Sequence, residues 1–70
     1  MTNTELKTAM LDKVPVIHRD KRRATMHTYD RINAIRYQPS ANGKLVISAE
    51  LLDEKANCVV RADAEEVEKA

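Results

Sequence analysis

The sequence predicts a small, mainly β domain, best described as an SH3-like barrel of about five antiparallel strands with an N-terminal helix. Three observations predict it: a helix-capping pattern near the start, a long alternating run at residues 44–53, and Asn42-Gly43 directly before that run. Consecutive antiparallel strands of this length close most readily into a small twisted barrel. The alternative is an α+β fold, in which an open antiparallel sheet of three or four strands carries the helix on one face.

The first element is a helix over about residues 3–12. Thr2 and Glu5 have the spacing of a capping box, in which each side chain accepts a hydrogen bond from the other residue's amide. Leu6 and Met10 follow at helical spacing, with Ala9 or Leu11 beside them. Because so short a helix is not stable alone, we expect it to dock on the sheet.

Strands follow the helix, and the β core covers about residues 14–70, so that residues 1–70 form a single domain. Pro15 ends the helical region and starts a short strand at residues 16–18. The polar, basic residues 19–25 form a loop or the tip of a two-stranded ribbon. The second strand region, residues 26–37, alternates imperfectly, which indicates either a bulge or apolar contact on both faces.

The strand at residues 44–53 is the spine of the predicted fold. A turn at residues 38–43 precedes it, in which Gly43, the only glycine, supplies a backbone conformation with positive φ. We expect Ser48 and Glu50 to point outward. The opposite face is apolar and is expected to lie in the core; its residues are Leu45, Ile47, Ala49 and Leu51.

In the remainder of the chain, the sequence predicts a turn at residues 53–57, a strand at 58–62, and a tight turn or single helical turn at 63–65. A one-turn helix before the last strand is typical of SH3-like barrels. Residues 66–68 are either a last short strand or the start of a frayed helix, and the sequence leaves both open for the segment 65–70.

The length and composition of the chain predict one small domain with a thin hydrophobic core. The 70 residues include no Trp and no Phe, so the core is aliphatic and oligomerisation would bury more surface. Cys58 is the only cysteine, which excludes an internal disulfide. Without a signal-peptide pattern or an apolar run long enough to span a bilayer, the sequence predicts a cytoplasmic protein with no membrane contact.

Charge is divided along the chain, although the net charge is only +1. Residues 18–36 carry six basic side chains against two acidic ones, whereas residues 50–70 carry seven acidic against three basic. The basic segment is a candidate contact for nucleic acid or for an acidic partner. The simpler interpretation is that the two segments face each other, within one molecule or across a dimer. The candidate residues are Arg19, Lys21, Arg22, Arg23, Arg31 and Arg36.

Support for nucleic-acid binding is limited, and a solvated basic loop is the favoured interpretation. The chain has no helix-turn-helix, zinc finger or other recognised nucleic-acid-binding motif. Only Tyr29 and Tyr37 could stack on bases. These two tyrosines are also candidate protein contacts, although we expect at least one to be partly buried with its hydroxyl at the rim.

Metal or catalytic chemistry would have to use His18, His27 and Cys58. No CxxC or HxxxH spacing connects them, and a lone cysteine in an aliphatic strand behaves as a small hydrophobic residue. A thiol nucleophile needs a pocket and an oriented base, which so small a chain seldom builds. The sequence therefore predicts no metal, no cofactor, no small-molecule substrate and no enzymatic activity.

Residues 29–37 and 45–53, with Glu5-Leu6-Lys7 and residues 14–17, resemble short proteins of unknown function encoded in prophages and integrative elements of Gram-positive gut bacteria. The resemblance covers most of the chain, but its motifs are structural, and it implies no activity and no site residues. The basic residues 19–25 depart from the shorter turn expected there. The sequence favours a non-enzymatic protein-interaction or self-associating module, with a nucleic-acid-binding accessory protein as the alternative.

Overall fold

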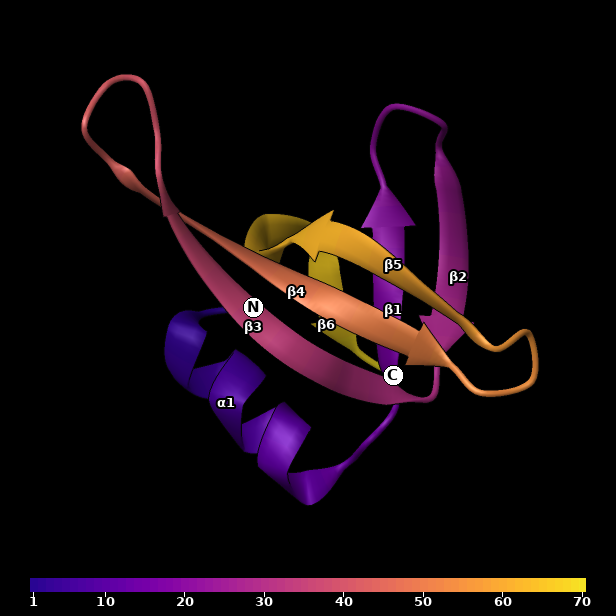
Figure 1. Cartoon of the computed structure of the whole chain (residues 1–70). Helices are drawn as coiled ribbons and strands as arrows, with labels where there is room; N and C mark the ends of the chain where they lie inside the picture. Colours follow the sequence, from indigo (N-terminus) through magenta and orange to yellow (C-terminus); the bar gives the residue numbers. More distant parts are fainter.

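The computed structural model describes residues 1–70, which form two antiparallel sheets and one helix (Figure 1). The sheets have the strand orders β2-β1-β6 and β3-β4-β5. The helix lies alongside β3 (Figure 1) and is too short and too polar to cross a bilayer. The elements are α1 (Asn3–Asp12), β1 (Val16–Asp20), β2 (Thr25–Tyr29), β3 (Arg31–Pro39), β4 (Leu45–Asp53), β5 (Cys58–Asp63), the 3-10 turn η1 (Ala64–Glu66) and β6 (Val67–Lys69).

The two sheets are not joined into a closed barrel. No strand of one sheet pairs with a strand of the other, and there are six strands, one more than the sequence predicted. The mainly β architecture with an N-terminal helix is confirmed, and the open arrangement fits the α+β alternative better than the predicted barrel. The last segment is resolved as a 3-10 turn followed by the short strand β6.

Local signals account for α1. The Thr2 hydroxyl accepts a hydrogen bond from the Glu5 amide at 3.2 Å, and the Glu5 carboxylate accepts from the Thr2 amide at 2.9 Å. The hydrogen bond from the Thr2 amide, with a smaller contribution from the Thr2 side chain, holds the pKa of the Glu5 carboxyl below its ordinary value. Leu6 and Ala9 are buried, whereas Leu11 is 77% exposed, so Ala9 completes the docking face.

The predicted second strand is divided between the two sheets at Asp30. Its amide donates to the carbonyl of Leu52 at 2.9 Å, and its carboxylate accepts from the amide of Glu54 at 2.7 Å. Asp30 therefore ties the crossing point to the end of β4. Further along β3 the register skips Asn33, which confirms the bulge alternative.

The first strand is longer, and the basic loop shorter, than the sequence predicted. β1 pairs with β2 from Val16 to Asp20, so Arg19 and Asp20, which the sequence placed in the loop, belong to the strand. The connection is a turn of residues 21–24, in which Ala24 has a φ of 51°. The Asp20 carboxylate accepts hydrogen bonds from the amides of Arg22 and Arg23 and so holds the turn.

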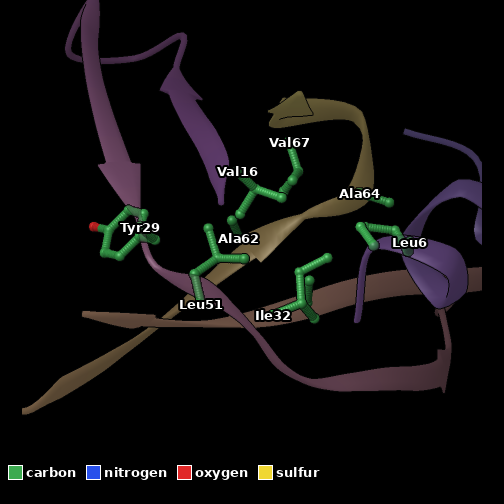
Figure 2. Packing of buried hydrophobic residues seen from close by; sticks show 10 residues of the cluster. Leu6, Val16, Tyr29, Ile32, Leu51, Ala62, Ala64 and Val67 are labelled. Carbon is green, nitrogen blue, oxygen red and sulfur yellow. The ribbon is translucent and has the colours of Figure 1, made fainter. Parts of the chain in front are cut away.

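The core lies between the sheets, and every helix and strand contributes to it. Val16 and Val67 of one sheet point toward Leu51 and Ile32 of the other (Figure 2). Leu6 closes the core from the side of α1 (Figure 2). Alanines supply four of its ten buried residues, which keeps the core thin; the set is Leu6, Ala9, Val16, Tyr29, Ile32, Ala49, Leu51, Ala62, Ala64 and Val67.

The β3–β4 hairpin projects beyond the rest of its sheet (Figure 1). β5 pairs only with residues 48–53 of β4, so residues 45–47 have β3 on one side and no strand on the other. This corrects two predictions. Leu45 is 61% exposed, because no second sheet lies opposite it, and Ser48 is buried, because β3 and β5 flank it. Gly43 has a φ of 81° in the turn, as predicted.

Candidate functional site

Most of the predicted basic contacts are already paired with acidic side chains of the same chain. Arg19 makes a bidentate contact with Glu68, with Nε–Oε1 and Nη2–Oε2 distances of 3.0 and 3.3 Å. This hydrogen-bonded pair lowers the pKa of the Glu68 carboxyl. Three further pairs are looser, with nitrogen–oxygen distances of 3.5, 3.5 and 3.9 Å; they are Arg31–Glu54, Arg36–Glu50 and Arg23–Asp20.

Three of these pairs join the basic segment 18–36 to the acidic segment 50–70 within one molecule. They are Arg19–Glu68, Arg31–Glu54 and Arg36–Glu50. The interpretation that the two segments face each other is therefore confirmed. Arg31 and Arg36 also share a face of their sheet, because their partners in the register, Leu52 and Ser48, are four residues apart on β4. Their positive charges are offset on that face by the nearby carboxylates.

Lys21 and Arg22 are the two candidate basic residues without an ion pair. Arg22 lines a surface cavity of about 310 Å³ together with Arg61, Asp63 and Glu66. The mixed charges give this cavity no strong preference for an anion.

His18 borders the same cavity, where the His18 Nε2 atom is buried without a hydrogen bond. The nearest carboxylate oxygen, Oε1 of Glu66, lies 3.7 Å away.

The two tyrosines have different environments. Tyr29 is 9% exposed and packs in the core, with its ring centroid 4.9 Å from that of His27. Burial, with smaller contributions from Cys58 and Asp53, raises the pKa of the Tyr29 phenol. Tyr37 is 43% exposed on the hairpin, and its hydroxyl donates to the Asn3 side chain. Of the two predicted protein contacts, only Tyr37 is exposed at the surface.

Cys58 lies at the start of β5, directly opposite Asp53 of β4. The His27 Nε2 atom is 3.8 Å from the same aspartate. The sequence predicted that Cys58 behaves as a small hydrophobic residue, but Cys58 is exposed, because the strand end beside the 54–57 turn leaves it uncovered. No group of three His, Cys, Asp or Glu side chains has a geometry that could hold a metal ion. This corner of the molecule is therefore an exposed strand end.

The hairpin carries a surface that the sequence analysis missed. Tyr37, Leu45 and Val46 are 43%, 61% and 41% exposed. Beside them lies a groove of about 510 Å³, with the hairpin as one wall and Met1, Ala64 and neighbouring residues as the other. The unequal lengths of the predicted strands, 44–53 against 58–62, were the available signal, because a shorter partner strand must leave part of the longer one unpaired.

Comparisons with protein-family models, with curated proteins and with solved structures find no match to this chain.

Proposed function

We propose that the chain is a non-enzymatic protein-interaction module and that the projecting β3–β4 hairpin is its contact surface. The observation that carries the proposal is the exposure of apolar side chains on both faces of the hairpin, Tyr37 and Leu45 on one face and Val46 on the other, beside a groove that Leu45 and Val46 line. Exposed apolar side chains gathered on one element mark interaction sites in small proteins. Most candidate basic side chains elsewhere already have carboxylate partners. Burial of the exposed apolar side chains of the hairpin against a partner would therefore be favourable.

Further features support this function. The only thiol, Cys58, is exposed outside both cavities, which favours a role without catalysis. A thin, alanine-rich core suits a module that gains stability on binding, including binding to a second copy. The bent β2–β3 segment and the 3-10 turn before β6 support a distorted SH3-like arrangement. The resemblance to short mobile-element proteins and the single cysteine support a cytoplasmic role in such an element.

Surface variants test this function. Wild-type protein, the double variant Leu45→Ser/Val46→Ser and the control Leu11→Ser are immobilised and exposed to extract of the host cell, and light scattering measures self-association. Leu11 is 77% exposed on α1 and therefore loses a similar apolar surface. We expect a binder, or a dimer, with wild type and the control but not with the double variant. Equal binding by all three folded proteins would overturn the assignment to the hairpin.

Nucleic-acid binding is the second candidate, because Lys21 and Arg22 remain without ion pairs in the β1–β2 turn. Each phosphate that a protein neutralises steepens the fall of affinity with salt. Fluorescence anisotropy with a labelled oligonucleotide at two salt concentrations measures this dependence. Binding at low salt that is lost in Lys21→Ala/Arg22→Ala supports the candidate, and unchanged or absent binding excludes it.

A further inference from the structure

The backbone of residues 45–47 lacks a neighbouring strand on one side. These residues pair with Pro39, Gln38 and Tyr37 of β3, whereas the pairing of β4 with β5 begins only at Ser48. In an antiparallel strand, backbone N–H and C=O groups point alternately toward the two neighbouring strands. Part of the hydrogen-bonding capacity of β4 is therefore directed toward an open side, where an extended chain can use it.

Residues 45–47 of this open edge carry no proline, no bulge and no charged side chain, three features that protect free edges in native sheets. By contrast, the edge strand β3 carries Pro39 and the bulge at Asn33, and the edge strand β5 carries Arg61 and Asp63. Residues 45–47, by contrast, are leucine, valine and isoleucine, with high strand propensity. The same segment that lacks a partner strand is thus the one best suited in sequence to acquire one.

The groove of about 510 Å³ lies along this open edge. Residues 45–47 line it from the hairpin, and Asp63, Ala64 and Glu65 line it where β5 ends. β5 ends at Asp63, where the chain turns into η1 (Figure 1). The lining residues therefore place the groove where a continuation of β5 would run. Three residues of extended chain span about 10 Å, which is the length needed to pair with the open edge.

Charges at the two ends of the groove give the added strand a direction. Asp63 and Glu65 lie at one end and Lys44 at the other, and none of the three takes part in an ion pair. A strand antiparallel to β4 would begin beside Asp63 and Glu65 and end beside Lys44. Complementary charge therefore favours a segment with a basic residue before its apolar part and an acidic residue after it.

We propose that the hairpin binds an extended peptide segment of a partner protein by strand addition to residues 45–47 of β4. The segment has apolar side chains at two alternating positions, opposite Leu45 and Ile47, a basic residue at its N-terminal end and an acidic residue at its C-terminal end. Main-chain hydrogen bonds supply affinity in such complexes, and alternate side chains supply specificity. This inference rests on the proposed function of the hairpin.

A designed peptide tests the proposal. The probe acetyl-Arg-Val-Thr-Val-Glu-amide is titrated into ¹⁵N-labelled full-length protein, and NMR follows amide shifts and hydrogen exchange. We expect saturable shifts centred on residues 44–47, with slower exchange there and a Kd on the order of 1 mM or tighter. The peptide N-methylated at its three central amides should not bind, and the charge-exchanged peptide Glu-Val-Thr-Val-Arg should bind roughly fivefold more weakly. Equal binding of all three peptides, or no shifts at residues 44–47, overturns strand addition.

Variants of the protein complete the test. Glu65→Lys should lower the affinity for the probe peptide roughly fivefold. Asp12→Lys, an equal charge change at the exposed end of α1, should leave that affinity unchanged. Leu45→Ser should abolish the shifts that Leu11→Ser retains. If the probe fails while Leu45→Ser/Val46→Ser still loses a captured binder, strand addition is wrong and the proposed function stands. If the groove is instead filled in a dimer that Leu45→Ser disrupts, the occupant is a second copy and the proposal of a partner peptide is overturned.

Discussion

The basic segment and the β3–β4 hairpin differ in how far the rest of the chain satisfies their interactions. Four of the six predicted basic contacts, Arg19 and Arg31 among them, already have carboxylate partners within 4 Å. On the hairpin, Leu45 and Val46 are exposed and the adjacent backbone has no partner strand. The basic side chains of residues 18–36 are thus largely neutralised by carboxylates of the same chain. Leu45 and Val46 have no comparable intramolecular partner.

The largest expected contrast lies within β4 itself. Leu51 is fully buried and Leu45 is 61% exposed, although both are leucines in the same strand. Leu51→Ala should lower the free energy of unfolding by about 2–5 kcal/mol, since it leaves a cavity in the core. Leu45→Ala should change it by less than about 0.5 kcal/mol. Urea denaturation of the two variants measures the difference, and similar losses would mean that Leu45 is covered and the hairpin is not free.

A smaller effect is expected at the hairpin turn. Gly43 has a φ of 81°, and a Cβ added there would meet no atom within 4 Å. Gly43→Ala therefore costs only the backbone strain, about 1 kcal/mol in the free energy of unfolding. Gly43→Asn should cost less, because asparagine tolerates the left-handed region. Denaturation of both variants tests this, and a neutral alanine would show that the turn abandons the positive φ.

The smallest effect concerns the Arg19–Glu68 pair, which is exposed to solvent. Arg19 holds the pKa of Glu68 below its ordinary value of 4.5. A carboxylate with a lowered pKa in the folded state stabilises the fold above that ordinary value, and this contribution is lost as the pH falls through the lowered pKa. In Arg19→Gln the pKa of Glu68 should rise toward 4.5. A ¹³C NMR titration of the carboxyl carbon measures it.

Lys21→Gln is the matched control, because Lys21 makes no ion pair and the substitution removes one positive charge only two residues along the chain from Arg19. In Lys21→Gln the pKa of Glu68 should be the same as in the wild type. Equal shifts in the two variants would mean that general charge, rather than the bidentate pair, lowers the pKa of Glu68.

The parts of the fold that depend on near neighbours could be predicted from the sequence. The spacing of Thr2 and Glu5 located the helix, and Asn42-Gly43 located the hairpin turn. Both signals act over a few residues. The division of the second strand at Asp30 could not be predicted, because it depends on hydrogen bonds to Leu52 and Glu54, more than twenty positions away.

The candidate site failed to emerge from the sequence for a related reason. Alternation shows that Leu45 and Leu51 share a face of β4, but it does not show whether a second sheet lies opposite each of them. Likewise, the count of basic residues in 18–36 could not reveal that Arg19 lies against Glu68, 49 positions later. The partners of a surface are set by topology, which periodicity and composition do not contain.

Site-specific photo-crosslinking compares the two regions directly. A photoreactive amino acid is placed at position 46 on the hairpin or at position 22 in the basic turn of the full-length protein, which is then illuminated in host-cell extract. We expect one partner protein to be crosslinked by the label at position 46, and we expect no crosslink to that protein from the label at position 22. Crosslinks from position 22 with none from position 46 would contradict the assignment of binding to the hairpin and return it to the basic turn.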